Sequence, residues 1–427
     1  MARNFPAVLL FLFSTLASAI PISPETSSTH WVDIWTAMPQ LTESANLPPV
    51  PFNSTPSIFP NTTLRQTLRL TQPASTIRLR LSNAFGTTDL PITNVSIALP
   101  PNNTLGTSVI IPDTVTPLSF DGEPSILIPS GSLAVSDPIT LPQGANTTLT
   151  VDVYLATGQT GEAITSHPGS RTTSWMTFGD EVGAKNLTGV DLVGVEHWYF
   201  LSAIEALLPH PYHSCAILGD SITDGRGSDT NENNRWPDLL LPILHQNPTT
   251  KTISLLNQAA GGNRILHDGL GPNLLSRIDR DVLAHSSVTH AIVFEGVNDI
   301  GTASTDQTTQ HITGDRIIRA YQQIITRLHA AGIKVFGATI TPFGTPKNAT
   351  VVQTYSDPER ERTRQRVNGW IRDGGGFDGV VDFDAMVRSE ADGSVLKSEF
   401  DSGDHLHLNP RGYEAMARGF PIYLFGG

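Results

Sequence analysis

The sequence predicts a protein of two differently built parts, an all-β sandwich or jelly roll followed by an α/β domain with a mostly parallel five-stranded sheet. Apolar residues alternate with a period of two over much of the first 200 residues, and compact apolar runs separated by helix-length connections follow. Composition changes at the same place, since 20 of the 31 prolines precede residue 201 and most charged residues follow it.

The first part has the pattern of short antiparallel strands. One run holds Leu64, Leu68 and Leu70, the next holds Ile77, Leu79 and Leu81 alternating with Arg78 and Arg80, and a third holds Val151, Val153 and Leu155. Such alternation places one face of a strand inward and the other outward. Pro100-Pro101 and Asp121-Gly122 are typical turn dipeptides. Many short strands with frequent turns predict a sandwich or jelly roll.

The second part changes to a helical period. Apolar residues from Ile317 to Leu328 form one stripe, and Gly332 is placed to end the helix. Five compact apolar runs are expected to be strands, and they cover residues 216–218, 253–256, 291–294, 335–340 and 380–383. Strands joined by helix-length connections indicate right-handed βαβ units, in which ligands bind beyond the carboxyl ends of the strands.

The start of the chain has the pattern of a secretory signal peptide. Arg3 precedes the apolar run Ala7–Leu16, and Ala17-Ser18-Ala19 is a small-x-small cleavage site. The alternative is a membrane anchor, but the run is shorter than the roughly 20 residues that span a bilayer. We expect a signal peptide over residues 1–19, a linker over 20–30, the β-rich domain over 31–208 and the α/β domain over 209–427.

N-glycosylation sequons agree with secretion. Asn247 is excluded because Pro248 follows it, and the remaining seven sequons are predicted acceptor sites, namely Asn53, Asn61, Asn94, Asn102, Asn146, Asn186 and Asn348. The sequence therefore predicts a secreted glycoprotein that makes no integral contact with a membrane.

Charge and cysteine content exclude several classes of protein. The formal net charge of −13 disfavours a partner with a phosphate backbone, so we expect no nucleic-acid binding. Cys215 is the single cysteine, which excludes an intramolecular disulfide framework and a cysteine-based zinc cluster. Its place on a predicted strand indicates burial instead.

Polar groups follow three of the predicted strands. Ser221 lies in the run 219–225 (GDSITDG), Gly262 in the run 257–264 (NQAAGGNR), and Asn298 in the run 296–299 (GVND). A serine at a sharp turn before a helix can present its hydroxyl, a glycine pair lets a backbone N–H approach a ligand, and an asparagine can donate from its amide. Taken singly, each also suits a plain helix cap, a flexible turn or an Asx turn.

A histidine near the C-terminus completes a reactive set. Asp404 precedes His407 by three residues, so its carboxylate can accept the imidazole N–H and turn the other ring nitrogen toward a serine. Acyl transfer needs these parts: Ser221 as nucleophile, His407 as base, and Asp404 to orient it. The backbone N–H groups of Ser221 and Gly262 and the Asn298 amide would form the oxyanion hole.

These blocks resemble those of the SGNH (GDSL) hydrolase family, whose Ser, Gly, Asn and His residues match Ser221, Gly262, Asn298 and His407. The resemblance covers about residues 213–420 and departs from many members at Ile222, where they have leucine. It implies a flavodoxin-like, three-layer α/β/α fold and metal-free serine esterase or lipase activity without a cofactor. The intervening sequence is similar to secreted microbial arylesterases and acylhydrolases that carry a β-rich N-terminal region.

The C-terminal histidines have two alternative uses. His405 as the base would need an aspartate at position 402, where the sequence has Ser402, so His407 is preferred. A metal site would gather Asp404, His405 and His407 with His267, but no HExxH pattern supports one.

The substrate is constrained less than the reaction. We expect hydrolysis of short-chain acyl, aryl or carbohydrate acetyl esters, with a long-chain lipase as the alternative. A further alternative is a secreted carbohydrate-binding protein whose hydrolase domain is vestigial. Five aromatic residues of the β-rich part could stack on sugars but more often pack in cores, and these are Trp31, Trp35, Phe52, Phe59 and Trp175.

Overall fold

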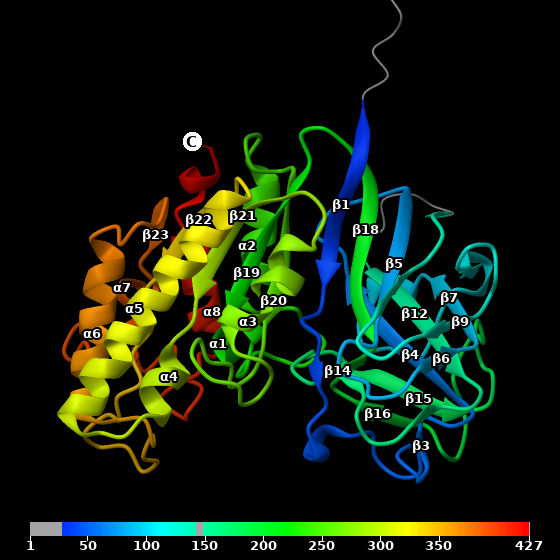
Figure 1. The fold of residues 1–427 in the computed structure, drawn as a ribbon, viewed down its shortest axis with the longest axis horizontal. Coiled ribbons are helices and arrows are strands. Elements are labelled where there is room, and N and C mark those ends of the chain that lie inside the picture. Colours follow the sequence, from blue (N-terminus) through cyan, green and yellow to red (C-terminus); the bar gives the residue numbers. More distant parts are fainter. Residues whose placement is uncertain (1–27, 142–147, 427) are drawn as a thin grey trace, which may run out of the picture.

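The computed structural model describes residues 28–141 and 148–426, which form two regions lying next to each other (Figure 1). We call residues 29–209 the β region and residues 213–426 the α/β region. The predicted signal peptide and the sequon at Asn146 lie outside the described residues, so both stay predictions. The expected linker ends too late, because the first strand already begins at Thr29.

Two antiparallel sheets make up most of the β region. The first contains β1 (Thr29–Thr36), β18 (Leu201–Pro209), β5 (Thr76–Ser82), β10 (Leu133–Val135) and β11 (Ile139–Thr140). The second contains β16 (Val193–Val195), β15 (Ser174–Phe178), β4 (Thr62–Arg69), β12 (Thr148–Leu155), β7 (Asn94–Ala98) and β8 (Thr116–Pro117).

Smaller sheets complete the β region. They pair β2 (Gln40–Leu41) and β17 (Trp198–Tyr199) with β14 (Thr165–His167), β3 (Ser57–Ile58) with β13 (Gln159–Thr160), and β6 (Leu90–Ile92) with β9 (Ile126–Ile128). Apolar residues of both large sheets belong to one core, so the sheets pack face to face as a sandwich.

The face of the second large sheet that points away from the core also carries buried side chains, including charged ones. Arg65 on β4 is completely buried, and its guanidinium forms a bidentate ion pair with Asp152 on β12, at 2.7 Å for each contact. The same guanidinium donates to the carbonyl oxygens of Ser108 and Ala184 in covering loops. A buried charge needs such partners, which explains how a strand with an arginine on its second face stays enclosed.

The α/β region contains one five-stranded sheet in which every pairing is parallel. Its strands stand in the order β20 (Ile253–Ala259), β19 (His213–Gly219), β21 (Val288–Phe294), β22 (Lys334–Ala338) and β23 (Gly379–Val381). In chain order this is 2-1-3-4-5, the flavodoxin-like arrangement.

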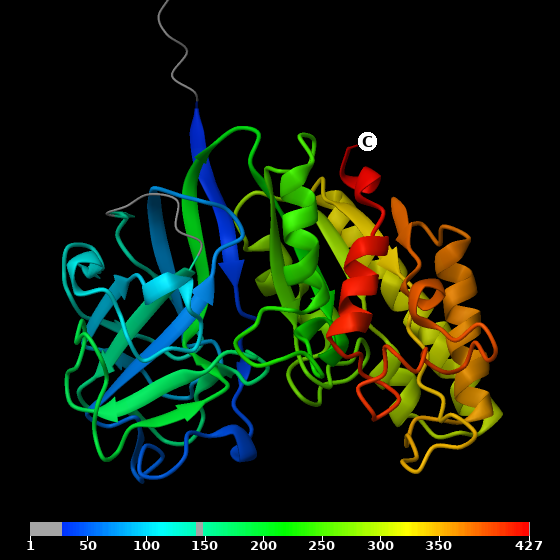
Figure 2. The same ribbon diagram turned by 180° about the vertical axis from the view of Figure 1, so that it is seen from behind.

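Helices cover both faces of the parallel sheet, which makes three layers (Figures 1 and 2). They are α1 (Ser221–Asp224), α2 (Trp236–Gln246), α3 (Leu274–Ile278), α4 (Val297–Thr302), α5 (Gln307–Ala330), α6 (Pro358–Arg372), α7 (Phe383–Val387) and α8 (Pro410–Gly419). The predicted stripe on α5 is buried, and Gly332 adopts a φ of 74° just after that helix.

Two predicted strands end earlier than expected. Residues Thr339 and Ile340 lie beyond β22, and Phe383 begins α7 rather than ending β23. The Asp382 side chain accepts a hydrogen bond from the Ala385 N–H, so this aspartate caps a helix where the apolar run suggested a strand.

Buried polar contacts fix the two regions against each other. Asp33 on β1 is fully buried, and its carboxylate contacts His285 Nδ1 at 2.9 Å and accepts from the Ser286 N–H at 2.6 Å. Its carbonyl oxygen accepts from the Ser214 hydroxyl on β19 at 2.9 Å. A site with walls from both regions is therefore held by this interface before any ligand binds.

Cys215 is fully buried on β19, and burial raises the pKa of its thiol. Within the residues that the structure describes, no helix is both long and apolar enough to cross a membrane.

Candidate active site

The candidate nucleophile lies at the carboxyl end of the parallel sheet. Ser221 is the first residue of α1, directly after β19 and the N-cap Asp220. The Asp220 carboxylate accepts from the Ile222 N–H at 3.0 Å, and Gly225, with a φ of 101°, ends this one-turn helix. The turn aims the Ser221 hydroxyl at His407, whose Nε2 lies 2.7 Å from Ser221 Oγ.

Asp404 orients the imidazole of His407. Asp404 Oδ2 lies 2.6 Å from His407 Nδ1, and its Oδ1 accepts from the backbone N–H groups of Leu406 and His407. Burial alone would raise the pKa of Asp404, but the hydrogen bonds and charge of His407 and these backbone N–H groups hold it well below its usual value. An ionised carboxylate only accepts, so Nδ1 carries a proton and Nε2 faces Ser221 as an acceptor.

The second histidine of this loop also has a carboxylate, contrary to the sequence argument. His405 Nδ1 lies 2.5 Å from Asp401 Oδ2, so the missing aspartate at position 402 did not leave His405 without a partner. The choice of base rests instead on reach, since it is His407 that contacts the Ser221 hydroxyl. The loop thus contains two Asp–His pairs, and only the pair of Asp404 and His407 contacts the Ser221 hydroxyl.

Three hydrogen-bond donors face the same space. The Ser221 N–H starts α1 and has no intrahelical acceptor. Gly262 adopts a φ of 71°, and its N–H has no hydrogen-bond partner within the described part of the chain. The Asn298 amide donates one N–H to the Asn263 carbonyl at 2.9 Å, and its oxygen accepts from the Tyr355 hydroxyl at 3.1 Å. The second Asn298 N–H has no partner among the described residues, and Asn298 lines the cavity.

The loop that carries Gly262 is fixed by Asp299. Its carboxylate accepts from the backbone N–H groups of Ile265 and Leu266 at 2.8 and 3.0 Å. Burial raises the pKa of Asp299 although these two bonds oppose the shift. Asp299, which follows β21, therefore fixes the backbone of the loop that carries Gly262.

His167 of the β region supports the Gly262 loop indirectly, through Asp224. Asp224, at the end of α1, accepts from the Gly261 N–H at 3.0 Å through Oδ2, and its Oδ1 lies 2.9 Å from His167 Nε2. His167 belongs to β14, and its Nδ1 lies 3.0 Å from the Met38 carbonyl oxygen. Both side chains are buried. Sequence reasoning missed this contact, because neither residue stands in a pattern that links them.

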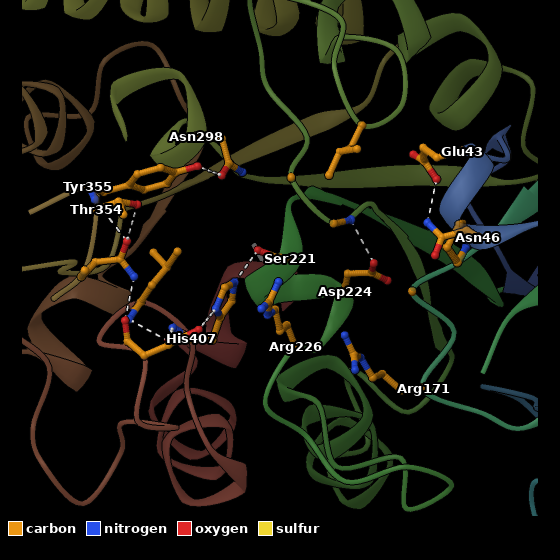
Figure 3. Close-up of a pocket in the computed structure, with 18 of the residues that line it drawn as sticks. Glu43, Asn46, Arg171, Ser221, Asp224, Arg226, Asn298, Thr354, Tyr355 and His407 are labelled. Carbon is orange, nitrogen blue, oxygen red and sulfur yellow. Dashed lines mark hydrogen bonds and ion pairs between the residues drawn. The ribbon is translucent and has the colours of Figure 1, made fainter. Parts of the chain in front are cut away.

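These groups line a cavity of about 630 Å³ that both regions enclose (Figure 3). The α/β region contributes the reactive residues together with Tyr355, Val351 and Leu270, and the β region contributes a wall. That wall consists of Gln40, Glu43, Asn46, Pro168, Gly169 and Arg171. None of these six residues was predicted, since loop positions of a β domain give no sequence signal for a partner surface.

Carboxyl groups beneath the site are kept from ionising easily. Burial raises the pKa of Asp220 to about 7, helped by the nearby carboxylates of Asp299 and Asp224. Burial likewise raises the pKa of Glu295 well above its usual value, despite the attraction of Arg277. Such shifts are common in functional sites.

The remaining predicted residues lie elsewhere. Trp35, Phe52 and Phe59 are buried in the core of the β region, and none of the five aromatic candidates lines the cavity. Asn53, Asn61, Asn94, Asn102, Asn186 and Asn348 are at least partly exposed. His267 contacts Arg316, and in the described ranges no group of three or more acidic, histidine or cysteine side chains is arranged to hold a metal ion.

Solved structures with a detectable likeness each align with about half of this chain. They include a GDSL-like lipase from Bacteroides thetaiotaomicron, at 16% identity and a TM-score of 0.34 over 49% of this chain and 88% of that chain. An acetyl xylan esterase matches at 21% identity and a TM-score of 0.35 over 48% and 96%. A carbohydrate acetylesterase family member from Sinorhizobium meliloti matches at 15% identity and a TM-score of 0.39 over 50% and 99%.

No curated protein matches the chain in sequence at a significant level. The model of the GDSL-like Lipase/Acylhydrolase family, by contrast, matches residues 217–415, a stretch that holds all five of the predicted reactive residues. This match confirms the resemblance of the motifs. The α/β region of this chain therefore carries a domain of the GDSL-like lipase/acylhydrolase family, a family of ester hydrolases.

Proposed function

We propose that this protein is a secreted serine esterase that cleaves carboxylic esters through an acyl-enzyme on Ser221. The observation that carries the proposal is the continuous contact from Ser221 Oγ to His407 Nε2 and from His407 Nδ1 to Asp404 inside the cavity. Secretion is proposed on the pattern of residues 1–19.

The reaction would proceed in two steps. In the first, His407 takes the Ser221 proton while Oγ attacks the ester carbonyl, and the imidazolium then protonates the leaving alcohol. In the second, His407 activates a water that attacks the acyl-enzyme, and Ser221 regains its proton as the acid is released. Asp404 stabilises the imidazolium, and the N–H groups of Ser221, Gly262 and Asn298 receive the negative charge of each tetrahedral intermediate.

The lining of the cavity supports a small or polar ester. Charged and amide side chains of the β region form one wall, and the apolar side chains of Leu270, Val351, Val352 and Leu406 lie apart from that wall in the α/β region. A long acyl chain would need a continuous apolar surface. Short-chain acyl, aryl or carbohydrate acetyl esters are therefore proposed in preference to long-chain lipids.

A 4-nitrophenyl ester series from acetyl to palmitoyl tests the proposal. The wild type should turn over acetyl or butyryl esters fastest, and Ser221→Ala should lose that turnover. Ser125→Ala, which alters an exposed serine of the β region, is the matched control. Equal rates for wild type and Ser221→Ala would exclude the assignment, and polysaccharide binding without turnover would favour the carbohydrate-binding alternative.

A further inference from the structure

Two arginines line the cavity without a partner. Arg171 belongs to a loop of the β region and Arg226 follows α1. Both side chains line the cavity (Figure 3). Neither guanidinium has a hydrogen bond or ion pair with any residue that the structure describes, and Arg171 Nε is buried. A buried donor without an acceptor costs free energy unless a ligand supplies one.

The buried arginines among the described residues are paired with acids. Arg65, Arg277 and Arg364 are buried, and each contacts a carboxylate within 3.0 Å. Arg235 contacts Asp238 at 2.6 Å. Arg171 is partly buried and Arg226 is exposed, so these two guanidinium groups, unlike the buried ones, are accessible to a ligand in the cavity.

The carboxylates of the cavity wall are already engaged. Glu43 accepts from the side-chain amides of Gln40 and Asn46 at 2.8 and 2.9 Å. Asp224 is held between His167 and the Gly261 N–H, and Asp404 orients His407. None of the three lies within ion-pair distance of Arg171 or Arg226 in the described part of the protein. Besides the three oxyanion donors, the two arginines therefore have unused hydrogen-bonding capacity in the cavity.

The backbone of each arginine is fixed near the nucleophile. The Arg226 N–H donates to the Ser221 carbonyl at 2.9 Å, and its own carbonyl accepts from the Tyr413 hydroxyl at 2.6 Å. Arg171 adopts a φ of 51°, and its carbonyl accepts from the Asn231 N–H of the α/β region at 2.9 Å. A non-glycine residue in this conformation is uncommon and is often found at ligand sites.

We infer that Arg171 and Arg226 form a subsite for a carboxylate in the alcohol part of the ester. The inference rests on the proposed esterase function. Leu270 packs against Gly262, so an apolar surface adjoins the oxyanion donors and suits the acyl group. The anionic group then belongs to the leaving alcohol, whose carboxylate the planar guanidinium groups match in shape and charge.

A matched pair of aryl acetates tests the subsite. 3-Acetoxybenzoate carries a carboxylate, and 3-acetoxybenzamide is a neutral ester of nearly the same shape. At pH 7 the wild type should show a kcat/KM for the benzoate at least tenfold above that for the benzamide. Arg171→Gln and Arg226→Gln should each lower this ratio by roughly tenfold, as expected for one lost charged hydrogen bond. Arg319→Gln, which alters an exposed arginine of α5, should leave the ratio unchanged.

The outcomes separate this inference from the proposed function. Hydrolysis of both esters at equal kcat/KM by the wild type, or a ratio that both arginine variants leave within twofold, would overturn the subsite while the esterase assignment stands. Persistence of both hydrolyses in Ser221→Ala would overturn the esterase assignment itself. As a second readout, 3-hydroxybenzoate should inhibit the wild type competitively more strongly than 3-hydroxybenzamide, and Arg171→Gln should remove that difference.

Discussion

The two regions of this protein contribute to one cavity in different ways. The α/β region supplies every group that we assign to bond making and breaking, with Ser221, Gly262 and Asn298 following strands of the parallel sheet and His407 in the loop before α8. The β region supplies a wall and one buried contact, from His167 to Asp224. Sheet topology therefore concentrates the reactive groups, whereas part of the surroundings of the substrate comes from the β region, to which we assign no reactive group.

The largest expected loss of kcat follows from replacing the histidine of one of the two Asp–His pairs, and the other pair serves as the comparison. His407→Ala should lower kcat for 4-nitrophenyl acetate by roughly 10⁴-fold or more, because loss of the base leaves the serine hydroxyl protonated. His405→Ala removes an imidazole with its own aspartate at the same loop and should retain most of the activity. Steady-state kinetics of both variants check this, and a greater loss in His405→Ala would reverse the assignment of the base.

Removal of one oxyanion donor should have the next largest effect. Asn298→Ala should lower kcat by about 10²–10³-fold, since the charge of the tetrahedral intermediate loses one hydrogen bond. Tyr355→Phe, which removes only the bond to the amide oxygen of Asn298, should cost far less. Thermal unfolding of both variants is the control, and an unfolded Asn298→Ala protein or an unchanged kcat would make Asn298 a structural residue.

A substitution in the β region should lower kcat by a smaller factor. His167→Phe removes the contact to Asp224, and the Gly261–Gly262 backbone should lose part of its support, with kcat falling about tenfold for one weakened oxyanion bond. KM should change less than kcat, because the contact acts on the position of a donor. His167→Gln can still donate to Asp224 and should restore most of the loss. Equal kcat values in wild type and His167→Phe would confine the role of the β region to the wall.

The last prediction concerns stability and pH rather than turnover. Because the folded-state pKa of Asp220 is raised to about 7, the folded protein holds a proton that the unfolded chain releases above about pH 4. The free energy of unfolding should therefore fall as pH rises from 4 to 7, by at most roughly 1.4 kcal/mol per unit from this group. Asp220→Asn still accepts from the Ile222 N–H and should lack this part of the slope. Urea unfolding at pH 4.5 and 7 compares the two, and identical slopes would contradict the shift.

Sequence patterns predicted the α/β region well for a physical reason. Buried parallel strands are compact apolar runs, and the short blocks around Ser221, Gly262 and Asn298 each follow such a run. The predicted end of the strand now seen as β23 was wrong, because the Asp382 side chain caps α7 through a hydrogen bond that hydrophobicity does not register.

The wall of the cavity could not be predicted in the same way. Arg171, Glu43 and His167 are separated from Ser221 by long stretches of chain, and their approach depends on how the regions dock through Asp33. The pairing of His405 with Asp401 was likewise missed, since only a spacing of three residues was considered. Docking and loop geometry are tertiary effects that a single sequence does not encode in a local pattern.

Covalent labelling with a serine-directed reagent tests whether Ser221 is the nucleophile of the cavity. Treatment of the folded wild type with diisopropyl fluorophosphate, followed by intact-protein and peptide mass spectrometry, should show one added group, on Ser221. Ser221→Ala should remain unmodified, and Ser125→Ala should react like the wild type. Modification of a different serine, or no modification of the folded wild type, would contradict the claim that the cavity between the two regions is built around a nucleophilic Ser221.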